Sequence, residues 1–224
     1  MVQVSIYVTT YQNEKTFSCV LDSYLSQTHE NIVINVFDNS YADKSYGIHD
    51  LITKKNDNRI NLIKNTTQIG PNLNYWKAMN SIDFNNMSMF MASDMGLAPN
   101  AIEIMLARAK ETSAQVIMPA ILEYPAEIFM KDSRTVLGGP GGHPKPFLYP
   151  APSLVNSMDL LQKYFSLENI AGDLFNFSFF GCLFDSDLLI NPPMDFLRFK
   201  QHGAEQYISM VLLNRAHKIF YETA

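Results

Sequence analysis

Near its start the chain reads Val4-Ser-Ile-Tyr-Val-Thr-Thr-Tyr-Gln-Asn-Glu14, an apolar, β-branched run that ends in a polar turn. Apolar residues then recur at helical spacing from Phe17 to Leu25. A buried strand followed by a helix is the first half of a βαβ unit. The turn between them exposes backbone N–H groups and hydroxyls that can hold a nucleotide. An ordinary strand-to-helix turn would have the same sequence, so this stretch alone leaves both interpretations open.

The alternation of strand and helix patterns continues through the first half of the chain. Further apolar, β-rich runs cover 31–37, 60–63, 87–92 and 115–118, and helical periodicity appears around 51–52 and over 71–79 and 99–109. Pro71 suits the first residue of its helix, where the missing N–H breaks no hydrogen bond. This alternation predicts an α/β fold with a Rossmann-like, mostly parallel central sheet flanked by helices.

The second half is less regular. Glycines and prolines crowd 138–146 and predict a loop or hairpin, after which we expect a helix over 157–165, an apolar strand over 177–184, a helix over 204–216 and a last strand over 218–222. We expect a single domain over 1–224, with a nucleotide-binding half of about 1–119 and a second half of about 120–224. The abrupt stop after the last strand is also what a fragment of a longer protein would show.

Charge and composition narrow the function classes. A net charge of −5 and a pI of about 5.5 provide no basic field for nucleic acid. Cys19 and Cys182 form neither a disulfide framework nor a zinc motif, which favours buried thiols and a cytoplasmic location. No apolar run approaches the ~20 residues of a membrane span, so we expect peripheral membrane association at most. Only 17% of residues are charged, which favours a companion domain, a second copy or a membrane face over part of the surface.

Three further segments end in polar residues at places where α/β proteins bind ligands. Asp38 follows a strand pattern and offers a carboxylate at the sheet edge, although a helix cap would look the same. Gly70 permits close backbone approach, with Asn74 one helical turn later, although this is also an ordinary helix start. Asp94 ends another buried strand pattern, where its carboxylate could bind a divalent ion at a diphosphate or lie in a solvent-facing turn.

Taken in order, these segments resemble the inverting family 2 glycosyltransferases of the GT-A fold. Thr9-Thr-Tyr-Gln-Asn-Glu14 is similar to the family's opening Pro-Thr-Tyr-Asn-x-Glu turn, and Phe37-Asp-Asn-Ser40 to its Val-Asp-Asn/Asp-Ser turn. Gly70 with Asn74 resembles its Gly-x-x-x-Asn helix start.

Two later segments extend the resemblance over nearly the whole chain. Ser93-Asp94, followed by a proline, resembles the family's Asp-Ser-Asp-Asp signature. Phe180-Gly-Cys-Leu-Phe184, followed by Gly203-Ala-Glu-Gln-Tyr207, resembles the strand and the Glu-Asp helix of the acceptor half. The order of the five matches is more specific than any one of them.

The resemblance implies a transferase that moves a sugar from a nucleotide-sugar donor, with UDP-sugars favoured, to a hydroxyl of a glycan or polysaccharide acceptor. It implies that Thr10, Tyr11 and Asp38 contact the base and ribose, that Asp94 holds Mn²⁺ or Mg²⁺ at the diphosphate, and that Glu205 is the general base of an inverting displacement. The full implied donor-binding set is Thr9, Thr10, Tyr11, Asp38, Asn39, Gly70, Asn74, Ser93 and Asp94.

The departures from the family pattern raise an alternative. Ala92 and Met95 stand where the family carries acidic residues, so a degenerate GT-A domain that serves as a binding or assembly module is the second hypothesis. A nucleotidyltransferase is disfavoured because the opening turn lacks a glycine-rich, basic loop. Histidines in loops are usually structural. His202 is a candidate to tune Glu205, and His143, after the glycine-rich segment, is a weaker one.

Overall fold

The computed structural model describes residues 1–40, 46–119, 122–123, 143–144, 152–165, 179–191 and 204–222. Its helices are α1 (Glu14–Leu25), α2 (Tyr46–Lys55), α3 (Pro71–Met79), α4 (Ala101–Thr112), α6 (Ser157–Phe165) and α7 (Ala204–Arg215), with a 3₁₀ turn, η2 (Ser186–Leu189). The strands of the main sheet are β1 (Val4–Thr10), β2 (Ile32–Asp38), β3 (Ile60–Lys64), β4 (Met87–Ala92), β5 (Val116–Met118), β8 (Ser153–Asn156), β9 (Leu183–Asp185) and β10 (Lys218–Tyr221).

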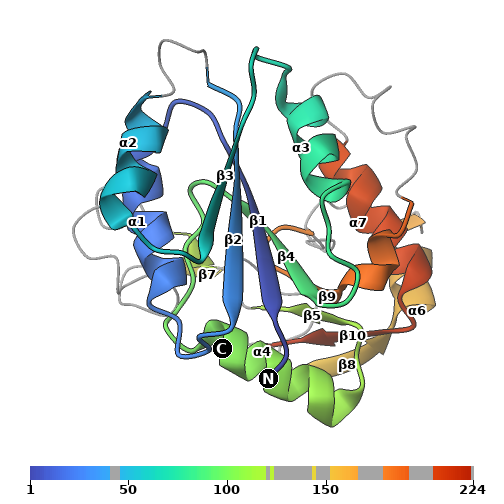
Figure 1. Cartoon of the computed structure of the whole chain (residues 1–224). Coiled ribbons are helices and arrows are strands. Elements are labelled where there is room, and N and C mark those ends of the chain that lie inside the picture. The colour runs from blue at the N-terminus through green and yellow to red at the C-terminus, as the bar shows by residue number, and fades with distance from the viewer. Residues whose placement is uncertain are drawn as a thin grey trace.

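One eight-stranded sheet runs through the molecule in the order β3-β2-β1-β4-β9-β5-β10-β8 (Figure 1). Strands β3, β2, β1 and β4 are mutually parallel, and β10 is parallel to β5. Strand β9 is antiparallel to both β4 and β5, and β8 is antiparallel to β10. The predicted mostly parallel α/β sheet is therefore confirmed, with β9 from the second half of the chain inserted among strands of the first.

Helices cover both faces of the sheet, as Figure 1 shows. Alternate residues of each central strand point to opposite faces, so that Val4, Ile6 and Val8 of β1 pack with α1, α2 and α4, whereas Tyr7 packs with α3, α6 and α7. Both faces are apolar because parallel central strands are covered on both sides. The polar groups of these strands therefore gather at the strand ends.

An aromatic row on the α3 side ties the central strands together. Tyr7 stacks on Phe90 with ring centroids 5.3 Å apart, and Phe90 stacks on Phe184 at 6.2 Å. Such pairs add about 0.5–1.5 kcal/mol each beyond the area they bury. They fix β9 beside β4, which brings the second half of the chain up to the candidate site.

The structure corrects several expected boundaries. The strand expected over 177–184 is short, because only 183–185 pair as β9, Phe180 forms an isolated bridge to Phe90, and 177–178 lie outside the described residues. Strand β8 was missed, since its four residues carry little pattern. The predicted loop or hairpin includes β7 (His143–Pro144), which pairs antiparallel with β6 (Leu122–Glu123).

Within the described ranges, no helix is both long enough and apolar enough to cross a bilayer.

Candidate functional site

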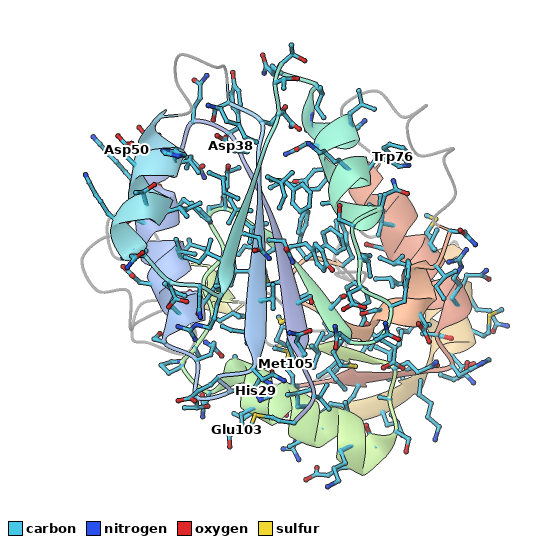
Figure 2. The ribbon with its side chains drawn as sticks, viewed as in Figure 1. His29, Asp38, Asp50, Trp76, Glu103 and Met105 are labelled. Atoms are coloured by element: carbon cyan, nitrogen blue, oxygen red, sulfur yellow. The ribbon has the colours of Figure 1, made fainter. Side chains whose placement is uncertain are left out.

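The candidate site lies where the direction of strand addition reverses. The chain adds β2 and β3 to one side of β1 and then returns to add β4 on the other side. In such sheets ligands bind at the carboxyl ends of the strands beside this reversal. Thr10, Asp38 and Ser93 lie at or just after those ends of β1, β2 and β4. Figure 2 shows Asp38 at this end of the sheet, with His29 and Glu103 at the opposite end.

Asp38 is a buried carboxylate with one saturated oxygen and one bare oxygen. Its Oδ1 accepts from Thr10 Oγ1 at 3.3 Å, from Ser40 N at 3.0 Å and from Ser40 Oγ at 2.6 Å. Its Oδ2 is buried and has no hydrogen-bond partner among the residues that the structure describes. A buried acceptor without a donor is costly, so Oδ2 is suited to a donor that a ligand brings. None of these three contacts forms the helix cap that was the alternative interpretation of Asp38, since the described donors come from the neighbouring strand and from Asp38's own turn.

The turn between β1 and α1 is fastened to the Asp38 turn. Asn39 N donates to Thr10 O at 3.0 Å, and Gln12 N donates to Ser40 Oγ at 3.1 Å. Gln12 has a φ of 49°, in the left-handed region that residues other than glycine seldom adopt. Thr9 is half-buried and Tyr11 is exposed, so the Tyr11 ring lies at the rim of the site.

A chain of buried amides joins Asp38's turn to α3. Asn39 Oδ1 accepts from Ile69 N at 3.0 Å and from Asn65 Nδ2 at 3.2 Å. Asn65 Nδ2 also donates to Asn74 Oδ1 at 2.9 Å, and Asn74 Nδ2 donates to Phe37 O at 3.0 Å. Asn39 and Asn74, both implied donor-binding residues, therefore use their side chains to hold the backbone around the site.

Gly70 and Pro71 begin α3 as the sequence predicts. Gly70 has a φ of 80°, which a residue with a Cβ rarely adopts, and Pro71 is the first helical residue. Asn74 N donates to Gly70 O at 3.2 Å, so the glycine and the asparagine lie one helical turn apart. Sequence reasoning missed Asn65 as part of the site. The sequence shows Asn65 only as an amide residue after a strand pattern, which is not specific to a binding site. In the structure Asn65 also contacts α3, because Lys77 Nζ donates to Asn65 Oδ1 at 2.7 Å.

Asp94 lies in a tight turn directly after β4. Met95 N donates to Ala92 O at 3.1 Å, which leaves Ser93 and Asp94 as the two central residues of the turn. The Asp94 side chain is exposed. On α1, the Tyr24 hydroxyl donates to Met95 O at 2.5 Å. Burial raises the pKa of Tyr24 well above its usual value, and the charge of Asp94 raises that pKa further.

The described residues provide one carboxylate for a metal ion at this turn. No group of three or more His, Cys, Asp or Glu side chains gathers anywhere in the described part of the chain. A divalent ion needs six or more ligands, which donor phosphates and water can supply around one carboxylate. The residues present therefore fit an ion that arrives with a diphosphate, and they do not form a site that would hold the ion alone.

The second half of the chain meets the Asp94 turn at Gly181. Gly181 N donates to Phe90 O at 2.8 Å, and a Cβ on Gly181 would lie 3.5 Å from Met95 Cε. Phe179, two residues earlier, donates its N–H to Ser209 Oγ of α7 at 3.1 Å. These hydrogen bonds join α7 to β4, the strand that ends at the Asp94 turn.

The expected acceptor-side residues differ in how far the structure describes them. Glu205 is the second residue of α7, so it lies at the start of that helix. His202 lies outside the described residues. His143 pairs with Glu123 between β7 and β6.

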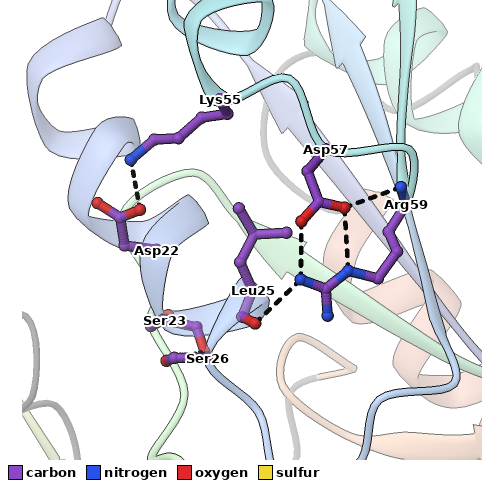
Figure 3. A network of polar contacts seen from close by, with 7 residues as sticks. All are labelled: Asp22, Ser23, Leu25, Ser26, Lys55, Asp57 and Arg59. Carbon is purple, nitrogen blue, oxygen red and sulfur yellow. Dashed lines mark hydrogen bonds and ion pairs between the residues drawn. The ribbon is translucent and has the colours of Figure 1, made fainter.

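Two other features lie away from this site. A groove of about 570 Å³ at the opposite end of the sheet is lined by Met1, Val2, His29, Met87, Glu103, Leu106, Ala107, Ala109, Lys110, Ser113, Ala114, Gln115 and Asp185. A polar network links α1 and α2 to the loop before β3 (Figure 3). Arg59 makes three hydrogen bonds to Asp57, two from its guanidinium and one from its backbone N–H, and a fourth to Leu25 O, while Lys55 pairs with Asp22. Neither holds a residue at the carboxyl ends of β1, β2 and β4.

Solved structures with the same arrangement come from S. aureus TarS. TarS 1-349 in complex with UDP-GlcNAc superposes with a TM-score of 0.68 at 16% identity, covering 99% of this chain and 56% of that one. TarS 1-349 in complex with UDP gives 0.69 at 16% identity, covering 99% and 58%. At this identity the likeness establishes the fold, and the chain spans little more than half the length of the TarS structures it matches. No curated protein matches the chain in sequence.

The family model described as glycosyl transferase family 2 matches residues 5–152, which is more than half of the chain. The matched region contains the Asp38 turn, the Asn65–Asn74 segment and the Asp94 turn. Since the family model and the GT-A fold agree over these elements, the protein belongs to glycosyl transferase family 2, a family of glycosyltransferase enzymes.

Proposed function

We propose that this protein transfers a sugar from a UDP-sugar to a hydroxyl of a glycan or polysaccharide acceptor, with inversion at the anomeric carbon. The observation that carries the proposal is the bare Oδ2 of buried Asp38 at the carboxyl end of β2. Around it, the proposed donor-binding residues are Thr9, Thr10, Tyr11, Asp38, Asn39, Gly70, Asn74, Ser93 and Asp94.

The number of free acceptor atoms favours uracil. Oδ1 already accepts three hydrogen bonds, so Asp38 has one oxygen left for the base. Uracil and thymine present one ring N–H between two carbonyls, whereas the guanine edge presents two adjacent donors and the cytosine ring nitrogen presents none. A single free oxygen matches the single ring N–H. TarS, which shares the fold, was crystallised with UDP and with UDP-GlcNAc.

The diphosphate is proposed to lie at the Asp94 turn. A divalent ion, Mn²⁺ or Mg²⁺, would neutralise the phosphate charge when bound there, and Asp94 would be its protein ligand. We expect Asp94→Ala to weaken UDP binding in the presence of Mn²⁺ and to abolish any difference between titrations with and without the metal. Equal affinity with and without Mn²⁺ in the unaltered protein would argue against this role for Asp94.

Glu205 is the proposed general base. Glu205 lies at the start of α7, about one helical turn before Ser209. Ser209 accepts from Phe179, two residues before Gly181, whose N–H donates to Phe90 O of β4. These contacts hold α7 beside the strand that ends at the Asp94 turn, and Glu205 would take the acceptor hydroxyl proton as that oxygen attacks the anomeric carbon. The displaced nucleoside diphosphate leaves from the opposite face. His202, three residues before Glu205 in the sequence, is proposed to tune the basicity of the Glu205 carboxylate.

A degenerate domain that binds without turnover is the second candidate. Ala92 and Met95 stand where the family carries acidic residues, and within the described residues no group of three or more possible metal ligands gathers at the Asp94 turn. Such a module would still bind nucleotide at Asp38. The two candidates therefore differ in turnover and not in nucleotide affinity.

The deciding experiment is a calorimetric titration of the protein with UDP, CDP, GDP and dTDP, each with and without Mn²⁺, followed by donor hydrolysis assays. We expect UDP to bind most tightly and Mn²⁺ to strengthen its binding. UDP binding with no hydrolysis or transfer across a panel of UDP-sugars would favour the degenerate module. A folded protein that binds none of these nucleotides would contradict both candidates.

The proposed cytoplasmic location, peripheral membrane association and association with a second copy or companion domain need separate tests. Cell fractionation addresses the first two, and analytical ultracentrifugation of the purified protein addresses the third.

A further inference from the structure

Helix α1 and the turn that follows it hold the segment after β4 through side chains of Ser23 and Gln27. Ser23 Oγ accepts from Leu97 N at 3.1 Å, and Gln27 Nε2 donates to Ala98 O at 2.7 Å while its Oε1 accepts from Ile102 N at 3.2 Å. These contacts cover the chain from two residues after Met95 to the start of α4. The path of the chain after Asp94 is therefore set by α1.

Two more contacts from α1 bracket Asp94 itself. Asn13 Nδ2 donates to Ser93 Oγ at 2.5 Å and approaches Ser93 O at 3.4 Å. Tyr24 donates to Met95 O at 2.5 Å. The residue before Asp94 and the residue after it are thus each fixed by a side chain of α1 or of its N-cap.

Neither of these two contacts is explained by the stability of α1 alone. Asn13 is the N-cap residue of α1, yet its side chain makes no capping hydrogen bond. Caps of this kind usually add about 1 kcal/mol to helix stability. Tyr24 is fully buried among apolar residues, where its hydroxyl needs a partner and finds it in the Met95 carbonyl. Side chains on a helix lean toward its N-terminus, so the Tyr24 hydroxyl reaches toward the end of α1 where Asn13 lies.

Fixing the turn matters more here because Asp94 stands alone. With Ala92 and Met95 beside it, no second carboxylate of the turn helps to place an ion. The affinity of a single ligand depends on how well its backbone is already held, because any freedom lost on binding weakens the complex. Partners outside the ligand set typically change metal affinity by 10- to 100-fold.

We propose that Tyr24 and Asn13 are positioning residues. By holding Met95 and Ser93, they keep the Asp94 carboxylate where it can bind the metal ion of a donor diphosphate. Neither residue touches the ion or the donor in this arrangement. The inference rests on the proposed function, since it assumes that a nucleoside diphosphate and its metal bind at Asp94.

The test compares two phenylalanine substitutions that each remove one buried hydroxyl. Tyr24→Phe removes the contact to Met95 O. Tyr7→Phe is the matched control, because Tyr7 is also buried and its hydroxyl bonds Ser81 O and Asp83 N in the loop that precedes β4, at the end of the strand away from Asp94. Each protein is titrated with UDP over a range of Mn²⁺ concentrations and with UMP without metal.

We expect Tyr24→Phe to raise the Mn²⁺ concentration for half-maximal enhancement of UDP binding by about tenfold. UMP affinity should change by less than about twofold, and Tyr7→Phe should leave both quantities within about twofold of the unaltered protein. Asn13→Ala, at the partly exposed start of α1, provides a second variant with the core intact and should show the same metal-specific loss.

The outcomes separate the two proposals. If the unaltered protein shows no Mn²⁺-enhanced binding of UDP, the donor site with a metal at Asp94 fails, and the role of Tyr24 and Asn13 fails with it. If that enhancement is present and both Tyr24→Phe and Asn13→Ala retain it unchanged, only the positioning role is overturned. An equal loss of UDP and UMP binding in Tyr24→Phe and in Tyr7→Phe would also overturn it, because that pattern reports general loosening of the core.

Discussion

Thr10 and Asp38 are register partners at the carboxyl ends of β1 and β2, and the Thr10 hydroxyl donates to Asp38 Oδ1 at 3.3 Å. This contact and two from Ser40 all fall on Oδ1, which leaves Oδ2 without a donor among the described residues. The geometry converts a common turn residue into an acceptor with one free oxygen. Selectivity for the nucleotide base should therefore depend on Oδ2, whereas Oδ1 holds the turn.

Asp38→Asn should lower UDP affinity by roughly 10- to 100-fold, in line with the about 1.5–3 kcal/mol of a hydrogen bond to a charged group. An amide can also turn its N–H₂ group toward the base, where it suits the ring acceptor of cytosine. We therefore expect the ratio of UDP affinity to CDP affinity to fall by more than the UDP affinity itself. Calorimetry with the two nucleotides measures it, with Asp50→Asn on the exposed surface of α2 as control. An unchanged UDP to CDP ratio would remove Asp38 from base recognition.

Glu205→Gln should lower kcat by about 10²–10⁴-fold, the usual contribution of a general base. The dissociation constant for UDP should stay the same, since a base acts on the acceptor in the transition state. Steady-state transfer assays beside calorimetry give both quantities. Gln206→Ala is the neighbouring control and should keep its turnover. Full turnover in Glu205→Gln would mean that another group is the base.

Asn65→Ala should destabilise the fold by about 1–3 kcal/mol, because Asn74 Oδ1 and Asn39 Oδ1 each lose a buried donor. The segment from Asn65 to Gly70 should also loosen, so UDP and UMP should weaken together, without a change in metal dependence. Thermal unfolding and calorimetry test the two parts. Asn61→Ala removes an exposed amide from β3, the strand that precedes Asn65, where Asn61 bonds Asn35 at 3.2 Å, and should cause neither effect. Similar unfolding temperatures for the two variants would contradict the role of the amide chain.

The Asp57–Arg59 pair should stabilise the fold at neutral pH and lose that effect in acid. Hydrogen bonds from Arg59 lower the pKa of Asp57 below its usual value, which is about 3.9 in an unfolded chain. A lowered folded-state pKa stabilises the fold above about pH 4, and the contribution disappears as the pH falls through the folded-state value. Asp57→Asn should therefore cost up to about 1 kcal/mol at pH 7 and little at pH 2.5. Urea unfolding at the two pH values checks this, and an equal cost at both would contradict it.

Local sequence patterns predict the strands and helices of the first half. Strands β1 and β4 and helices α1 and α3 have strong local patterns, and Pro71 marks the start of α3 within the chain itself. The resemblance to family 2 rests on the same local stretches, so it could be recognised before any contact between them was known. Hydrophobic periodicity and turn chemistry are short-range properties, which is why they can be predicted from one sequence.

Tertiary structure decided what the site residues do. Strand β9 runs antiparallel between β4 and β5, a choice made by packing of Phe184 on Phe90 and not by its three-residue pattern. The bare oxygen of Asp38 follows from the register of β2 on β1, and the support of the Asp94 turn follows from Tyr24, 71 residues away from Met95. Contacts between residues so far apart in the sequence depend on how the sheet is ordered and covered, and no local pattern encodes that order.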